Sequence, residues 1–467
     1  MPPNVLLIVF DTARADAFEP YGGGSGASPA VAQLAARGSA LSDAYAPSNW
    51  TLPSHVSMLT GLSPRESGLA QAPGGDALKC RPYVEAMSDL LMPEVLRRAG
   101  YATRAVSANG WFSSAVGFAT GFEKFHDVRG TRRQKPHAGG IRDRIAWALE
   151  SIYAHADDGA EAARELIGTW IKENAQPFFW MVNLVECHSP YLPPRPYNDM
   201  SLRARMRSAQ DVQDHQTLLA VWRACVVREP LPSDALARMR HLYGRAIRMM
   251  DDWLARVLEM LDRARLLDDT LVIVTSDHGE NLGESNLVGH AFSLDERLIK
   301  IPLISAGPGA FSIDGPMSLV HLPKLIADGL ELKDHPWEAN PVPDGIVVSE
   351  YDSMGGPEDP RVVRVRGEWS LDEDGIARLT SSGTAATDGR VKLVREHGKE
   401  LLYDLVADPM ETGPVDARAR SDGFVEQLRA AIEKAEAERA RVKPLDVSTS
   451  EGEREDLEER LKLLGYL

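Results

Sequence analysis

The stretch Thr270-Leu-Val-Ile-Val-Thr-Ser-Asp-His-Gly-Glu280 decides the fold class of this chain. It opens with a short apolar run, which is typical of a strand buried on both faces of a sheet. Val5–Phe10 and Phe178–Leu184 repeat this pattern. Helical patterns lie between the three runs, at Met87–Arg98, Ala160–Glu173 and Leu242–Leu266. Strands that alternate with helices predict an α/β fold with a mainly parallel central sheet flanked by helices.

Polar side chains follow each of these runs. Asp11 comes directly after the first, Glu186 and His188 after the second, and Asp277 with His278 after the third. In open parallel sheets, ligands bind outside the carboxyl ends of the strands. The pattern therefore indicates a functional site at that edge of the sheet.

The composition excludes several classes of function. The chain has 467 residues, and its 52 Lys and Arg against 68 Asp and Glu give a net charge of −16. Such an acidic protein repels nucleic acid and anionic lipid, so neither is an expected partner. Cys80, Cys187 and Cys225 show no CxxC spacing, which excludes a disulfide framework or a thiolate zinc cluster. No stretch approaches the roughly 18 apolar residues of a membrane span, so the expected location is the cytoplasm.

Three segments are predicted along the chain. Residues 1–335 form the large α/β domain, with a polar helical insertion at Asn198–Asp234 (about 195–240) that caps the site. A linker rich in Pro, Asp and Asn, Leu332–Gly345, leads to a small α+β domain at 345–445, and 446–467 form a terminal helix. The small domain is assigned from a helical pattern at Gly423–Val442 and from strand-like runs at Ile346–Ser349, Val362–Val365, Val391–Val394 and Leu401–Leu405.

Asp11 and Thr51 each allow two interpretations. A carboxylate at the end of the first strand suits a metal ligand, but Asp11 also suits a turn or a helix N-cap. Pro53 fits the first turn of a helix, which puts Thr51 at or beside the N-cap. There the hydroxyl lies near unsatisfied backbone N–H groups, an environment that attracts an anionic substrate. The alternative is a threonine that only begins a structural helix.

The turn after the third strand carries a stronger signal. Asp277 and His278 are adjacent potential metal ligands, and Gly279 lets the backbone bend sharply. His290 follows in a loop, where it either donates to a leaving-group oxygen or is an exposed histidine. His188 precedes a Pro-rich turn and fits substrate or ligand contact and structural hydrogen bonding equally well.

Together these segments resemble the sulfatase branch of the alkaline phosphatase superfamily over nearly the whole chain. Five ordered motifs carry the resemblance: Asp-Thr-x-Arg-x-Asp at Asp11–Asp16, the nucleophile motif with Leu-Thr-Gly at Thr51–Gly61, His-x-Pro-Tyr at His188–Tyr191, Thr-Ser-Asp-His-Gly-Glu at Thr275–Glu280, and Lys-Leu…Leu-Tyr-Asp-Leu…Asp-Pro-x-Glu-Thr at Lys392–Thr412. The resemblance implies an alkaline-phosphatase-like α/β fold and a metal-dependent ester hydrolase.

Two positions depart from the sulfatase motif. Sulfatases carry Cys or Ser at the nucleophile, for oxidation to formylglycine, and Arg four residues later; this chain has Thr51 and His55. A secondary alcohol cannot give the aldehyde. Threonine nucleophiles occur in relatives such as nucleotide pyrophosphatases/phosphodiesterases, phosphonoacetate hydrolase and phosphoethanolamine transferases. The resemblance therefore implies a small anionic phosphate or phosphonate ester as substrate, rather than a sulfate ester.

One divalent metal ion is implied by the same resemblance, held by Asp11, Thr51, Asp277 and His278. Two-metal relatives add an Asp-x-x-x-His pair, but Leu184 stands four residues before His188. Calcium sulfatases usually carry Asp-Asn where this chain has Asp-His, so Mn²⁺ or Zn²⁺ is favoured over Ca²⁺.

The expected reaction is a double displacement through a phospho-threonine intermediate. Thr51 attacks, His290 assists the leaving oxygen, and His55 orients Thr51, while Asn109, His188 and His290 contact the substrate. Three alternatives stay open: a soluble phosphotransferase with the same nucleophile, a sulfuric ester hydrolase, and a non-catalytic family member.

The leaving group is expected to be selected by the cap, by the loop Asp127–Gly140 and by the C-terminal domain. This loop carries Arg132, Arg133, Lys135 and His137, which form either an anion site or a solvated basic loop. No feature of the sequence indicates an oligomeric state.

Overall fold

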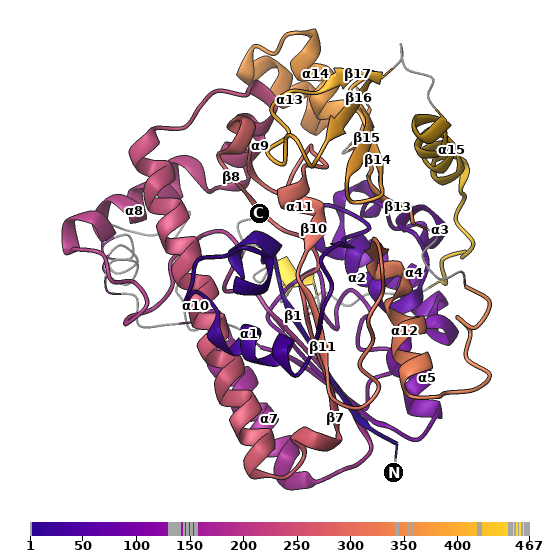
Figure 1. Cartoon of the computed structure of the whole chain (residues 1–467). Helices are drawn as coiled ribbons and strands as arrows, with labels where there is room; N and C mark the ends of the chain where they lie inside the picture. The colour runs from indigo at the N-terminus through magenta and orange to yellow at the C-terminus, as the bar shows by residue number, and fades with distance from the viewer. Residues whose placement is uncertain are drawn as a thin grey trace.

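The computed structural model describes residues 2–128, 157–340, 345–353, 355–356, 358–417 and 423–446, with scattered residues of the segments between them and of the tail. Its described part contains a seven-stranded sheet and a five-stranded sheet as its two largest sheets (Figure 1). The basic residues predicted around Arg132 and most of the predicted tail helix lie outside the described residues.

The seven-stranded sheet confirms the predicted α/β fold class. Its strand order is β2-β11-β7-β1-β6-β4-β5. The five strands from β7 to β5 are parallel, whereas β11 pairs antiparallel with both β7 and β2. The bounds are β1 (Asn4–Phe10), β2 (Gly38–Ala40), β4 (Ala102–Ser107), β5 (Lys124–Asp127), β6 (Phe178–Leu184), β7 (Thr270–Thr275) and β11 (Leu303–Ala306).

Two separate hydrophobic cores cover the faces of this sheet. Alternate side chains of β1 enter them: Val5, Leu7 and Val9 lie in one, and Leu6, Ile8 and Phe10 in the other. Helices on opposite sides of the sheet close the two cores (Figure 1). On one side are α2 (Thr51–Thr60), α5 (Met92–Arg98) and α12 (Leu322–Gly329); on the other are α1 (Pro29–Ala36), α7 (Ala160–Glu173) and α10 (Ser233–Arg263). Because both faces are covered, β1, β6 and β7 are apolar at most positions, and their polar residues are Asn4, Asn183 and the threonines at the two ends of β7.

The five-stranded sheet near the C-terminus is antiparallel throughout. Its strands are β13 (Val347–Tyr351), β14 (Gly383–Thr387), β15 (Val391–Glu396), β16 (Lys399–Asp404) and β17 (Val415–Asp416). Helix α15 (Gly423–Ala437) packs against it through Val425, Leu428 and Ile432, which recur at helical spacing on one face.

The strand-like run at Val362–Val365 is instead part of a helix, α13 (Pro360–Trp369), so that prediction is wrong. The β-branched residues suggested a strand, but their burial follows a helical period. Val362 and Val365, three residues apart, are buried, whereas Val363 between them is 52% exposed. The two buried valines pack in a cluster with Phe292 and Cys225, and this tertiary contact outweighs the strand propensity of valine.

The segment expected to cap the site contains two helices, α8 (Leu202–His215) and α9 (Leu218–Val227), and the first turns of α10. The expected linker is packed at Trp337, whose side chain is buried and whose Nε1 donates to the carbonyl oxygen of Thr60 at 2.8 Å. This part of the segment therefore packs against the C-terminal end of α2.

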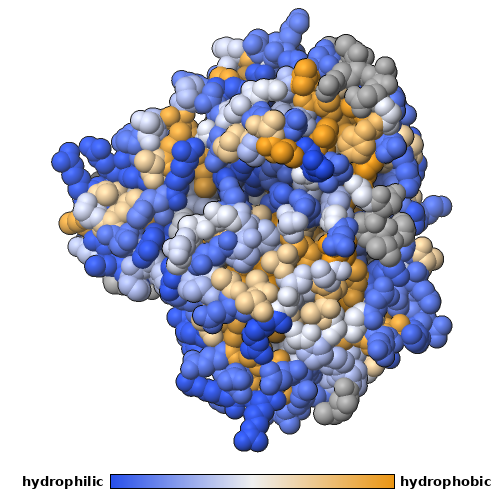
Figure 2. Space-filling view, in the orientation of Figure 1, coloured by the Kyte–Doolittle hydropathy of each residue, from blue (hydrophilic) through white to orange (hydrophobic). Residues whose placement is uncertain are grey.

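Among the described residues, no helix combines the length and the apolarity that crossing a bilayer requires. Hydrophilic side chains cover most of the face shown in Figure 2, with smaller apolar areas between them.

Candidate active site

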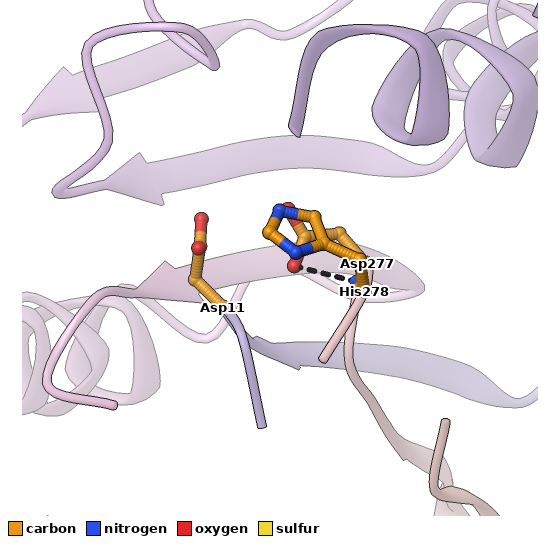
Figure 3. Close-up of side chains that lie close together, drawn as sticks. All are labelled: Asp11, Asp277 and His278. Atoms are coloured by element: carbon orange, nitrogen blue, oxygen red, sulfur yellow. Dashed lines mark hydrogen bonds and ion pairs between the residues drawn. The ribbon is translucent and has the colours of Figure 1, made fainter. Parts of the chain in front are cut away.

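Two neighbouring strand ends bring Asp11, Asp277 and His278 together. Asp11 follows β1 and the Asp277-His278 turn follows β7, which pairs with β1 in parallel. One ligand atom from each residue lies within 4.8 Å of the others, and all three side chains are fully buried (Figure 3). Within the part of the chain that the structure describes, no other group of three His, Cys, Asp or Glu side chains is this close.

Hydrogen bonds to the protein leave one ligand atom of each residue available. Oδ1 of Asp277 accepts from the backbone N–H groups of Thr12 and His278 at 3.2 and 3.0 Å. Oδ2 of Asp277 and Oδ1 of Asp11 have no hydrogen-bond partner among the described atoms. Nδ1 of His278 lies 2.9 Å from the carbonyl oxygen of Gly279, which fixes the proton on Nδ1 and turns the Nε2 lone pair toward the acids.

These residues fit a divalent cation. Burial raises the pKa of Asp11 well above its ordinary value, and the nearby Asp277 carboxylate raises it further. Burying two ionised carboxylates side by side without a counter-charge destabilises the folded state, and a bound cation offsets that destabilisation. Two carboxylates and one imidazole are ligands that Zn²⁺ and Mn²⁺ accept.

Gly279 is required by a close backbone approach. A Cβ at this position would lie 2.0 Å from the carbonyl oxygen of Arg297, and the Gly279 N–H donates to Leu298 at 2.7 Å. The glycine of the motif therefore lets the turn pack against the segment Asp295–Ile299. The sequence indicated a sharp bend, whereas the structure shows a lack of space for a side chain.

Thr51 is the first residue of α2, and Trp50 is its N-cap. Its Oγ1 lies 3.5 Å from Nε2 of His278 and accepts a hydrogen bond from Nδ2 of Asn109 at 3.3 Å. The side chain is fully buried. The hydroxyl thus joins the Asp11, Asp277 and His278 group, at the helix end where backbone N–H groups favour an anion.

Asn109 holds both Asp11 and Thr51. Its Nδ2 also donates to Oδ2 of Asp11 at 2.6 Å, so both amide hydrogens are engaged, and its Oδ1 accepts from the Trp111 N–H. The sequence assigned Asn109 to substrate oxygens; in this structure the amide positions the nucleophile candidate and an acid. Substrate contact by Asn109 stays a prediction.

His55 supports Thr51 through the backbone. Its Nδ1 lies 3.0 Å from the Thr51 carbonyl oxygen, and Nδ2 of Asn183 lies 3.0 Å from its Nε2. Nδ1 therefore donates and Nε2 accepts. Burial lowers the pKa of His55, and the ring stacks on Phe112 with centroids 4.5 Å apart. Sequence reasoning missed Asn183, although an amide near the end of an apolar strand was a usable signal.

His290, His188 and Glu280 complete the group. The His290 ring centroid lies 4.7 Å from that of His278 and 5.1 Å from that of His188. Glu280, also missed as a functional residue, accepts from Nδ1 of His290 at 3.0 Å. Burial, with the nearby His290, lowers the pKa of His188 to about 4, and its Nδ1 lies 2.6 Å from the Ser189 carbonyl oxygen. A neutral His188 therefore carries its proton on Nδ1.

Glu186 has a different role from the other polar residues at the strand ends. Its Oε1 accepts from the Ala160 N–H at 2.7 Å, at the start of α7. The structure therefore uses this carboxyl group to hold a helix end.

A mainly parallel sheet with three buried potential metal ligands and a hydroxyl at its carboxyl edge fits a hydrolase of the alkaline phosphatase superfamily. The model of the Sulfatase family matches residues 3–328, and the chain belongs to this family. Members of the family bind a divalent metal ion. The resemblance found in the sequence motifs is confirmed.

Individual relatives include enzymes of two kinds. A sulfatase of Formosa agariphila is 24% identical over 93% of this chain and 87% of that protein. Iduronate 2-sulfatase of Mus musculus is 25% identical over 66% of this chain, which spans 59% of that enzyme. The phosphonate monoester hydrolase of Agrobacterium radiobacter shares the fold with a TM-score of 0.62, at 20% identity over 93% of this chain and 95% of that one.

Proposed function

We propose that this chain hydrolyses a phosphate or phosphonate ester with unmodified Thr51 as the nucleophile. The observation that carries the proposal is the position of the Thr51 hydroxyl, 3.5 Å from Nε2 of His278 and beside two buried acids. A threonine that only began a helix would have no need of buried metal ligands around its hydroxyl.

The residues around Thr51 favour an attacking geometry. Asn109 fixes Oγ1, and His55 fixes the carbonyl group of the same residue. Asn183 in turn fixes the His55 ring. Holding a nucleophile in one orientation removes much of the entropic cost of the reaction.

The proposed reaction has two balanced steps. In the first, a bond forms between Thr51 Oγ1 and phosphorus while the bond to the leaving alcohol breaks, and His290 donates a proton to the leaving oxygen. The Thr51 proton leaves to solvent. In the second, a bond forms between a water oxygen and phosphorus while the bond between phosphorus and Thr51 Oγ1 breaks; the proton lost by the water passes to His290, and Thr51 Oγ1 takes up a proton from solvent. Glu280 orients the His290 ring and stabilises its positive charge.

Asp11, Asp277, His278 and the Thr51 hydroxyl would hold one divalent ion. When bound, the ion supplies charge neutralisation and makes the threonine hydroxyl easier to deprotonate. The imidazole of His278 favours Mn²⁺ or Zn²⁺ over Ca²⁺, because Ca²⁺ prefers oxygen ligands.

The preference for a phosphoryl over a sulfuryl substrate depends on the side chain at position 51. Threonine cannot be converted to the aldehyde on which the formylglycine mechanism relies. Oxygen nucleophiles of hydroxyl side chains suit phosphoryl transfer, where positioning and electrostatics provide most of the catalysis.

Matched 4-nitrophenyl esters provide the test: a phosphate monoester, a methylphosphonate, a phosphate diester and a sulfate, each assayed with Mn²⁺, Zn²⁺ and Ca²⁺. We expect turnover of at least one phosphorus ester and a smaller rate on the sulfate. Faster turnover of the sulfate by protein with unmodified Thr51, verified by mass spectrometry, would overturn the phosphoryl preference. Added alcohols test for transfer to an acceptor.

A further inference from the structure

A pocket of about 160 Å³ adjoins the site and reaches His188, Glu280 and His290. Segments far apart in the sequence form its walls. Trp222 comes from α9 of the expected cap, and Tyr351 comes from β13 of the five-stranded sheet. Because His290 is the proposed proton donor to the leaving oxygen, the pocket lies where the leaving alcohol would be.

Aromatic rings dominate the wall of this pocket. Trp50 and Trp111 form a T-shaped pair with centroids 5.2 Å apart, and Trp222 and Phe292 form a second pair at 6.0 Å. Such pairs hold the rings in fixed positions and offer large apolar area at small entropic cost.

The polar groups of the wall are used largely by the protein itself. Three hydrogen bonds show this: Trp50 Nε1 to the Ala70 carbonyl oxygen at 3.4 Å, Asn49 Nδ2 to the Ser293 carbonyl oxygen at 3.0 Å, and the Tyr191 N–H to Gln216 Oε1 at 3.0 Å. A ligand in the pocket therefore meets mainly carbon atoms and ring faces.

The charges around the pocket disfavour an anionic ligand. None of the described lining residues is Lys or Arg. Two lining residues are acidic, Glu280 and Asp352; Glu280 is paired with His290, and Asp352 is exposed. An additional carboxylate, sulfate or phosphate on the leaving group would be desolvated here with no cationic partner except His290, whose charge Glu280 already balances.

We propose that this pocket binds the leaving alcohol and selects esters in which that alcohol is apolar and carries no negative charge. The inference rests on the proposed function, since it assigns the substrate class of the same site. It excludes polyanionic leaving groups such as sulfated sugars and nucleotides. Positively charged organic groups are accepted, because aromatic faces and the Asp352 carboxylate both attract cations.

Three methylphosphonate esters that differ only in a remote group test the proposal. The leaving groups are 4-propylphenol, 3-(4-hydroxyphenyl)propanoate and 4-(2-trimethylammonioethyl)phenol, in which methylene groups insulate the phenol oxygen from the charge. We expect kcat/KM for the anionic ester to be about tenfold below that for the propyl ester, and the cationic ester to match or exceed the propyl ester. An anionic ester that equals or exceeds the propyl ester would overturn the proposal, as would a cationic ester that falls below it.

Variants of the wall make the test specific. Asp352→Asn should narrow the difference in kcat/KM between the propyl and the anionic ester about threefold. The effect is limited to this size because the carboxylate is exposed and partly screened. Trp222→Ala should lower kcat/KM for the propyl ester about tenfold, whereas Leu219→Ala, an exposed residue of the same helix outside the pocket, should not change it. Equal effects of the two helix variants would contradict the assignment.

Binding of the free phenols, measured by calorimetry on wild type and on Thr51→Ala, needs no turnover. The predicted order of affinity places the anionic phenol below the propyl phenol and the cationic phenol at or above it. If the phenols bind in this order while no phosphorus ester is hydrolysed, the proposed function fails and the pocket assignment stands. If the esters are hydrolysed through Thr51 without any charge order, the pocket assignment fails and the proposed function stands.

Discussion

Oγ1 of Thr51 and Nε2 of His278 lie 3.5 Å apart, although 227 positions separate them in the chain. Thr51 begins α2, on one face of the large sheet, and His278 follows β7. The carboxyl edge of the sheet brings the two segments together. Every proposal about this chain's chemistry depends on the short distance between these two side chains.

Thr51→Ala should abolish turnover of phosphorus esters, by at least ~10³-fold in kcat, because the covalent step has no nucleophile. Thr51→Ser keeps a hydroxyl group and should retain measurable activity. Rapid quenching of wild type with substrate should give a phosphorylated peptide containing residue 51, detected by mass spectrometry. Wild-type rates in the alanine variant would rule out Thr51 as nucleophile.

Metal binding should stabilise the fold. An ion at about 100 times its Kd adds ~2.7 kcal/mol to the free energy of unfolding, which thermal unfolding detects as a higher Tm. Chelation should lower Tm and abolish turnover, and Mn²⁺ or Zn²⁺ should restore both. Asp11→Asn should lose the metal-dependent rise in Tm without a lower Tm in chelator, because it removes one of two adjacent buried acids.

Asp16→Asn is the matched control for that experiment. Asp16 lies in the same motif but pairs with Arg14 at 2.6 Å and has a side chain that is 57% exposed. It should keep the full metal-dependent rise in Tm. Loss of the rise in both variants would show that the motif acts through folding, and not through a ligand at position 11.

His55→Gln should lower kcat about 10- to 100-fold with a small change in KM, because the ring positions Thr51 through its carbonyl group. The metal-dependent rise in Tm should persist, since His55 is outside the proposed ligand set. Ser57→Ala, also buried in α2, serves as the control and should keep kcat. An unchanged kcat in His55→Gln would refute the positioning role.

Glu186→Gln should change the pH dependence of stability. Burial, with the charges of Asp158 and Asp157, raises the pKa of Glu186 from 4.5 to about 8. Below pH 4.5 the carboxyl is protonated in both folded and unfolded chains, so its raised pKa does not lower the free energy of unfolding. Above pH 8 it is ionised in both, and the folded state bears the full cost, roughly 5 kcal/mol. Wild type therefore loses stability as pH rises from 4.5 to 8.

Urea unfolding at pH 5.5 and pH 8 measures this effect. The free energy of unfolding of Glu186→Gln, relative to wild type, should increase between these values because glutamine stays neutral. Glu165→Gln, at an exposed position of α7, should show no such increase. A difference between Glu186→Gln and wild type that is independent of pH would contradict the raised pKa.

The architecture was largely predictable from apolar patterning. β1, β6 and β7 were located because strands covered on both faces form nearly continuous apolar runs. Patterning failed at Val362–Val365, where the helical packing of two valines against a distant cluster overrode β-branched propensity.

The sequence by itself determined the central strands, the position of Thr51 at a helix start, and the motifs that identify the family. These are local properties, set by side-chain periodicity and by backbone chemistry within a few residues. Only the tertiary structure decided that Asn109 holds Asp11 and Thr51, that Asn183 fixes His55, and that aromatic rings from five distant segments wall one pocket. Those contacts depend on how closely the ends of strands and helices approach one another in the folded chain. The spacing of residues along the sequence does not encode that distance.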